Sequence, residues 1–390
     1  MDQPITSLLC DLVTLPSVNP GGDTAKTESP YGESRVAEYV EAYFRRYDVR
    51  TERQPVLPGR DNLLVHLPGR QAGAKSILLE AHMDTVDVEG MEAPFSAVLD
   101  GGRIRGRGAC DTKASLAVMM MVLHLLIEEG ISTPGGVCLA ATVDEEYGET
   151  GVQRLLESAE GFSAAVVGEP TMLSVAPSTN GVIWFRILTH GVSAHASAPE
   201  GGVNAILAMA DVMAALRARS STVLSARRHP LCGSPNLTVC RIRGGSSENV
   251  VPNRCEITID RRLMPGESWQ AAFQETQTWI RQALGEGPAR VEFEEPYHIE
   301  PSLEIPPDHK LVRALGAAAG DVLGETRLAG LPYTTHASFL AAAGIPSVVF
   351  GPGNVEQAHT VEEFVEVDQL VQAVEILKRF VTRFAESLWD

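Results

Sequence analysis

The chain has 390 residues, which is more than one ordinary hydrophobic core accommodates and suits two domains. Hydrophobic residues make up 44% of it, as is typical of a folded globular protein. The formal net charge of −18 argues against nucleic acid and anionic membrane surfaces as partners, because their phosphates would be repelled.

Three features favour a soluble cytoplasmic protein. The first residues, MDQPITSLLCDLVTL, lack the basic segment and cleavage site of a signal peptide, and the longest apolar helix candidate, residues 114–127, is too short to cross a bilayer. The six cysteines contain no CxxC pair and are typical of buried thiols in a reducing compartment.

The first half of the chain alternates between helical and strand patterns. Apolar spacing predicts amphipathic helices over about 5–15 and 36–47. Four short apolar strands are predicted at 62–67, 76–83, 137–143 and 164–169, with helices at about 112–129 and 150–159. This βαβ alternation predicts an α/β fold with a doubly wound, mostly parallel sheet covered on both faces.

The pattern changes near Pro177. Strands at 180–190, 236–245, 254–263 and 289–295 and helices at 203–218 and 267–284 follow the order β-α-β-β-α-β, which is typical of a ferredoxin-like α+β domain. A helix at 308–323, a strand at 346–351 and a last helix at 367–387 then resume the earlier pattern. We therefore predict a catalytic domain over 1–178 and 297–390, and an inserted dimerisation (lid) domain over 179–296.

Polar residues gather where the predicted strands end, which is where open α/β sheets bind ligands. They are His82 and Asp84, Asp111 before the next helix, Glu145 and Glu146, Glu169, and His359. Taken singly, each has an ordinary explanation: a structural His-x-Asp pair, a helix N-cap at Asp111, or a solvated turn at the acids. Their convergence on one rim favours a metal site.

Mixed histidine and carboxylate ligands suit zinc, cobalt or manganese in a hydrolytic site, whereas magnesium or calcium favours oxygen ligands alone. Two ions need a shared anionic bridge, which Asp111 can supply through its two oxygens, and such a pair activates a water between them. If Glu146 binds an ion, its neighbour Glu145 is free to act as the general base.

Several motifs carry a resemblance to a known family: AHMDTV, GRGACDTKAS, TVDEEYGETG, VGEPT, GVSAHASAPEGGVNAI and GPG…AHT. Over essentially its whole length the chain is similar to the dizinc metallohydrolases that include acetylornithine deacetylase, succinyl-diaminopimelate desuccinylase, aminoacylase and the glutamate carboxypeptidases. The resemblance implies two Zn²⁺ per chain, with Co²⁺ or Mn²⁺ as substitutes. It places His82, Asp111 and Glu169 on one ion, and Asp111, Glu146 and His359 on the other. It also implies that Asp84 orients His82 and that Glu145 is the base.

The resemblance assigns further residues in the inserted domain. It implies that His195 stabilises the tetrahedral oxyanion across a homodimer, that Asn249 helps to bind substrate, and that Arg262 grips a substrate carboxylate. From the residues alone, His195 suits an ordinary loop histidine, and Arg262 suits an ion pair with Asp260 equally well.

One position departs from the family. The segment PYTTHASFLAAAG has His336 where many relatives have an acid. A supporting role and an occasional metal contact are open alternatives, and we favour substrate binding and specificity.

The metal-site residues predict a hydrolase, and the overall resemblance implies that it cleaves the amide bond of a small N-acyl amino acid with a free carboxylate. A dipeptidase or a glutamate carboxypeptidase-like enzyme is the alternative. A non-catalytic metal-binding homologue is more remote, because the base and all five ligands are present.

Overall fold

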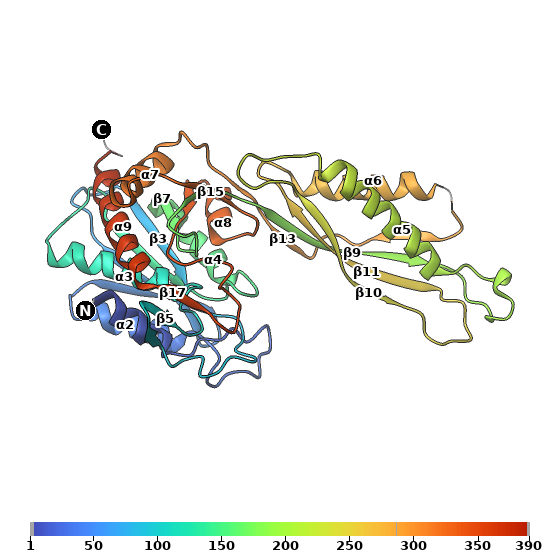
Figure 1. Ribbon diagram of the computed structural model, residues 1–390, viewed down its shortest axis with the longest axis horizontal. Coiled ribbons are helices and arrows are strands. Elements are labelled where there is room, and N and C mark those ends of the chain that lie inside the picture. The colour runs from blue at the N-terminus through green and yellow to red at the C-terminus, as the bar shows by residue number, and fades with distance from the viewer. Residues whose placement is uncertain (1–3, 286, 388–390) are drawn as a thin grey trace. The chain divides into compact units, whose positions relative to one another are not determined.

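A computed structural model describes residues 4–285 and 287–387 and divides the chain into two compact units (Figure 1). The first unit comprises Met1–Pro177, Ile305–Ala329 and Thr335–Asp390. The second comprises Ser178–Glu304 and Gly330–Thr334.

The first unit is an α/β assembly. Its helices are α1 (Pro4–Val13), α2 (Ser34–Arg45), α3 (Lys113–Glu128), α4 (Thr150–Leu155), α7 (Lys310–Leu323), α8 (His336–Ala342) and α9 (Val367–Ser387). Its strands are β1 (Arg50–Leu57), β2 (Arg60–Leu67), β3 (Ser76–His82), β4 (Val98–Asp100), β5 (Arg103–Arg105), β6 (Val137–Thr142), β7 (Phe162–Val167), β16 (Ser347–Val349) and β17 (Phe364–Glu366). Strands β8 (Val175–Thr179) and β15 (Leu328–Leu331) cross the boundary between the units.

The main sheet has the strand order β1-β2-β6-β3-β7-β16-β8. Strand β3 is parallel to both of its neighbours, β6 and β7, and β16 is parallel to β7. Strands β1, β2 and β8 pair antiparallel at the two sides. The predicted mostly parallel α/β fold is therefore confirmed.

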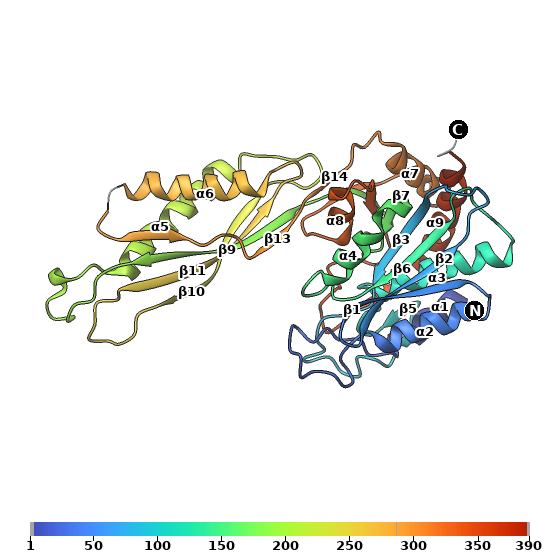
Figure 2. The same ribbon diagram turned by 180° about the vertical axis from the view of Figure 1, so that it is seen from behind.

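Helices cover both faces of this sheet, because its central strands are apolar on both sides. Ile77, Leu79 and Ala81 of β3 join a core formed with α1, α2, α3, α7 and α9. The intervening residues of β3, including Glu80 and His82, point to the other face. Helix α4 packs against β1, β2 and β6, and α8 packs against β7 and β16. Figures 1 and 2 show α3 and α9 on one side of β3 and β6, with α4 and α8 on the other.

A separate three-stranded sheet, β17-β5-β4, is absent from the sequence-based prediction. Each strand has three residues, too few to produce a recognisable alternation. The pairing of β17 with β5 joins residues 364–366 to residues 103–105. This antiparallel pair flanks the two segments that carry Glu363 and Asp111.

The second unit contains α5 (Ala205–Arg219) and α6 (Trp269–Leu284). Its strands are β9 (Gly181–His190), β10 (Asn236–Gly244), β11 (Arg254–Leu263), β12 (Arg290–Phe293), β13 (His298–Glu300) and β14 (Leu303–Glu304). The antiparallel order β10-β11-β9-β12, with both helices on one face (Figure 1), is the ferredoxin-like arrangement. Because β13 also pairs with β9, residues up to Glu304 cluster with this unit, beyond the predicted boundary at 296.

In the described part of the chain, no helix combines the length and apolarity that crossing a bilayer requires.

Candidate metal centre

Three parallel strands bring their carboxyl ends to the same edge of the sheet. In the register of β3 and β6, His82 lies opposite Thr142, so the residues that follow each strand are neighbours. The acids Glu145 and Glu146 follow β6, and Glu169 follows β7 two residues after Val167. The predicted convergence therefore arises directly from strand pairing.

Asp111 lies between the two histidines. Its Oδ1 is 3.2 Å from His82 Nε2, and its Oδ2 is 3.2 Å from His359 Nε2. The two oxygens of one carboxylate thus face two different imidazoles, as a bridging ligand requires. Glu363 fixes this segment, because its carboxylate accepts hydrogen bonds from the backbone N–H groups of Cys110 (2.8 Å) and Asp111 (3.0 Å).

The three glutamates complete the cluster. Glu146 Oε2 lies 3.2 Å from His359 Nε2, while Glu169 Oε1 and Glu145 Oε2 lie 3.8 and 3.9 Å from His82 Nε2. Candidate ligand atoms of His82, Asp111 and Glu146 all lie within 4.8 Å of one another, and so do those of His82, Glu145 and Glu169. The second set therefore includes Glu145 with His82 and Glu169. The resemblance instead implies Asp111 as the third ligand of that ion.

The donor set fits divalent metal ions. Carboxylates outnumber imidazoles in the cluster, so cations are needed to balance the charge. The buried Oε1 atom of Glu146 has no hydrogen-bond partner among the described residues, which leaves it free to bind an ion. Nitrogen and oxygen donors without thiolate suit zinc-type ions.

Electrostatic effects within the cluster are strong. Burial raises the pKa of Glu145 and of Glu169 well above the usual range of a glutamate, and neighbouring carboxylates add to the effect. Hydrogen bonds to Asp111 and Glu146 raise the pKa of His359 to about 10. Burial opposes charge on His82, but Glu145 and the hydrogen-bonded Asp111 raise its pKa well above the ordinary value.

Asp84 supports both His82 and the glutamate loop. Its carboxylate accepts the backbone N–H groups of Glu145 (3.2 Å) and Glu146 (3.0 Å) and the amide of Asn19 (2.8 Å). His82 Nδ1 lies 3.0 Å from the carbonyl oxygen of Asp84 and 3.5 Å from its Oδ1. This side of the ring is therefore held by Asp84, which leaves Nε2 directed at the cluster.

The comparisons with known proteins agree with this geometry. Residues 78–383 match the model of the family described as peptidase family M20/M25/M40. The chain belongs to that family. It is therefore a member of a metallohydrolase family, and the resemblance identified from the sequence is confirmed.

Curated relatives of similar length carry a deacetylase name. A protein of Myxococcus xanthus named acetylornithine deacetylase is 29% identical over 359 residues, covering 89% of this chain and 91% of the relative. A protein of Erwinia tasmaniensis with the same name is 29% identical over 383 residues, covering 96% of each chain.

Solved structures with the same fold include peptidases. A tripeptidase from Staphylococcus aureus has a TM-score of 0.80 at 20% identity, with 98% of each chain covered. A Bacillus subtilis protein described as a dinuclear metal binding peptidase from the M20 family has a TM-score of 0.75 at 18% identity, also with 98% of each chain covered. At these identities the likeness establishes the fold.

A buried ion-pair network lies behind the glutamate loop of this family member. Arg60 contacts both carboxylate oxygens of Glu33 at 2.6 Å, and its Nη2 lies 3.1 Å from Asp144 Oδ1. Asp144 has φ +67° and also accepts a hydrogen bond from Asn19. No local sequence pattern indicates this network, because its members are far apart in the chain.

Replacing Arg60 with Met should lower the free energy of unfolding by about 3–5 kcal/mol, because Glu33 and Asp144 lose their buried counter-charge. Urea denaturation at neutral pH measures this effect. Arg45→Met is the matched control, since Arg45 is 72% exposed and its ion pair with Glu41 contributes little. Equal effects of the two substitutions would contradict a stabilising role for the network.

His336 is in the first unit but is not open to solvent. Its side chain is 1% exposed, and its two ring nitrogens lie 2.8 Å from Glu80 Oε1 and 2.9 Å from Glu149 Oε2. Both nitrogens are thus occupied by carboxylates. This placement favours a supporting role for His336 over the predicted contact with substrate.

The other predicted residues lie in the second unit. His195 is exposed, and its Nδ1 lies 2.7 Å from Ser197 Oγ and 3.2 Å from the backbone N of Ser197. The carbonyl oxygen of Asn249 accepts the N–H of Ala196, which places Asn249 next to His195. Arg262 forms a two-point ion pair with Asp260, with distances of 2.9 and 3.0 Å.

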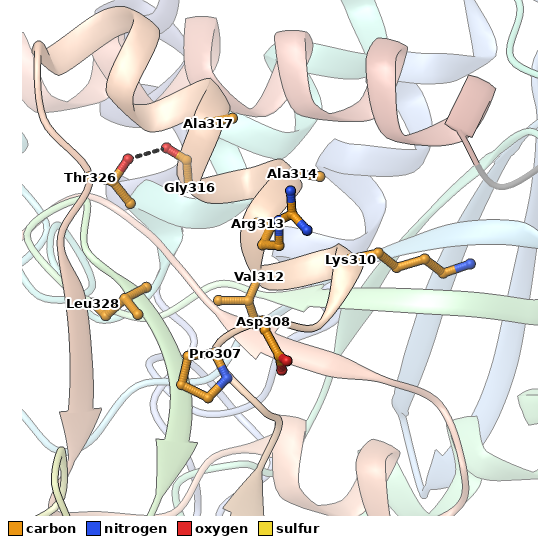
Figure 3. Close-up of a pocket in the computed structure, with 10 residues that line it drawn as sticks. All are labelled: Pro307, Asp308, Lys310, Val312, Arg313, Ala314, Gly316, Ala317, Thr326 and Leu328. Carbon is orange, nitrogen blue, oxygen red and sulfur yellow. Dashed lines mark hydrogen bonds between the residues drawn. The ribbon is translucent and has the colours of Figure 1, made fainter.

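Two pockets in the first unit lie outside the ligand cluster. One, of about 620 Å³, runs beside α7 and is lined by residues including Asp308, Lys310 and Arg313 (Figure 3). The other, of about 640 Å³, is lined by residues including Arg60 and Tyr147. Neither lining contains a histidine, so neither is the candidate metal centre.

Proposed function

We propose that the protein hydrolyses the amide bond of a small N-acyl amino acid with a free carboxylate, using two Zn²⁺ ions. The observation that carries this proposal is the cluster of the five candidate ligands, in which Asp111 faces both histidines and Glu145 lies 3.9 Å from His82, anchored through Asp84. The deacetylase name shared by curated relatives over nearly their full length supports an acyl group as the part removed.

His82, Asp111 and Glu169 would hold one ion, and Asp111, Glu146 and His359 the other. Such ions polarise the scissile carbonyl and lower the pKa of water. Zinc is our choice, with cobalt or manganese as substitutes, because the donors are imidazole and carboxylate.

Glu145 has the remaining chemical role. It takes a proton from the attacking water and passes it to the departing amine. Burial raises the pKa of Glu145, which is the direction that a base working near neutral pH requires. Asp84 keeps Glu145 in place by accepting the N–H groups of Glu145 and Glu146.

The second unit would contribute substrate contacts. A proton on Nε2 of His195 would let this residue donate a hydrogen bond to the oxyanion. Asn249 and Arg262 remain predicted substrate ligands. For Arg262 to grip a carboxylate, its guanidinium must share its donors with Asp260.

A peptidase is the second candidate. The structural neighbours include a tripeptidase and the human protein named carnosine dipeptidase 1, which has a TM-score of 0.70 at 14% identity. The same base and ions would serve a peptide bond, so the two candidates differ in what lies on the acyl side. A non-catalytic metal-binding homologue is the remote alternative.

A substrate panel tests the proposal. Zinc-loaded protein is incubated with N-acetyl, N-succinyl and N-formyl amino acids, dipeptides and tripeptides, and the released amine is measured. Turnover of one N-acyl class supports a deacylase, whereas turnover of peptides alone supports the peptidase. No turnover by protein that holds two ions per chain would contradict both.

Removing metal should abolish activity and weaken the fold. Without ions the carboxylates of Glu145, Glu146 and Glu169 repel one another, so we expect a chelator to lower the melting temperature as well as to stop turnover. Zn²⁺ or Co²⁺ should restore both properties, and Mg²⁺ should restore neither. Full activity in excess chelator after complete metal loss would contradict the proposal.

A homodimer formed through residues 179–296 and a cytoplasmic location remain predictions from the sequence. Sedimentation of the purified protein tests the first.

A further inference from the structure

His336 is enclosed by acids that belong to different parts of the fold. It opens helix α8, and its side chain is 1% exposed. Glu80 of β3, whose side chain is also 1% exposed, contacts Nδ1 at 2.8 Å. Glu149, whose side chain is 9% exposed, contacts Nε2 at 2.9 Å. Thr142 of β6 adds a hydrogen bond of 2.5 Å to Glu80 Oε1.

The two acids belong to two of the segments that supply the metal centre. Glu80 precedes His82 by two residues on β3 and therefore lies on the same face of the strand. Glu149 ends the loop that carries Glu145 and Glu146, and its backbone N–H donates to the carbonyl oxygen of Asp144 at 2.7 Å. His336 thus connects β3 to this loop through its contacts with Glu80 and Glu149.

The charge state of His336 suits this position. A neutral imidazole has one N–H donor, whereas the imidazolium has one for each carboxylate. Burial by itself lowers the pKa of His336, but Glu80 and Glu149 outweigh it and raise the pKa well above the ordinary value. The contact with Glu149 is an ion pair, in which Nε2 lies 2.9 Å from Oε2.

We propose that His336 is a positioning residue of the metal centre: its contacts with Glu80 and Glu149 fix His82 relative to the loop that bears Glu145 and Glu146. The expected effects on turnover rest on the proposed function, whereas those on metal affinity do not. Supporting residues of this kind typically change metal affinity or activity by about 10–100-fold when they are lost.

A double-mutant cycle tests this role with His336→Gln, Glu149→Gln and the double variant. Affinity for Zn²⁺ is measured by competition with a chelating dye, and kcat and KM are measured on the best substrate. We expect His336→Gln to lower zinc affinity and kcat about 10–100-fold while KM changes less than about threefold. The double variant should be no worse than His336→Gln alone, because both substitutions break the same contact.

Other outcomes overturn the proposal. Additive losses in the cycle would mean that the two residues act separately, and a changed KM or substrate preference with unchanged zinc affinity would mean that His336 contacts substrate. If His336→Gln fails to fold, the proposal is tested with Glu149→Gln alone. This variant should still weaken zinc binding measurably, and unchanged zinc affinity would overturn the proposal. His66→Gln, on β2 and outside the cluster, is the control that should leave zinc affinity unchanged.

Discussion

Replacing Glu145 with Gln is expected to reduce kcat by about 10²–10⁴-fold while the fold and the bound metal are retained. Glutamine keeps the shape of the side chain but cannot accept the proton of the attacking water. The backbone of the loop should stay in place, because Asp84 accepts the N–H groups of residues 145 and 146 whatever the side chain at 145.

The comparison requires kcat, KM and zinc content for Glu145→Gln and for a control. Glu160→Gln is a suitable control, because Glu160 is an exposed acid outside the cluster. A variant at 145 with two ions and normal turnover would exclude Glu145 as the base. A variant that loses an ion would show instead that Glu145 is a ligand, as its place beside His82 and Glu169 also permits.

Replacing Asp111 with Asn should remove both turnover and at least one of the two ions. The two oxygens of Asp111 face His82 and His359, each at 3.2 Å, and asparagine offers only one oxygen. The bridge between the sites is therefore lost. Losing a residue that merely supports a ligand typically lowers activity by about 10–100-fold, and the loss in Asp111→Asn should be larger.

Metal content by mass spectrometry and zinc affinity measure this effect. Asp100→Asn, an exposed acid on β4, is the matched control and should bind zinc normally. Full zinc content and turnover in Asp111→Asn would rule out a bridging carboxylate at this position.

The convergence of the candidate ligands could be predicted where strand topology decides their position. Because β3, β6 and β7 are parallel neighbours, residues at their carboxyl ends must meet, and His82, Glu145, Glu146 and Glu169 do. The position of His359 does not follow from this strand pairing. It follows β16 by several residues and joins the cluster through a loop in which it has φ +60°.

Contacts between segments distant in the chain could not be predicted. Glu363 anchors the Asp111 segment from more than 250 residues away, and Arg60 pairs with Glu33 and Asp144. None of these three acids belongs to a periodic pattern. The sequence shows that His336 departs from the family. The carboxylates that surround it come from β3 and from the loop before α4, so only the folded structure reveals its environment.

Anomalous diffraction from zinc-loaded crystals, recorded at the zinc absorption edge, tests the metal centre most directly. Two peaks are predicted. One should lie within bonding distance of His82 and Glu169, and the other within bonding distance of Glu146 and His359. Asp111 should contact both. One peak alone, or peaks away from Asp111, would contradict a two-ion centre bridged by that carboxylate.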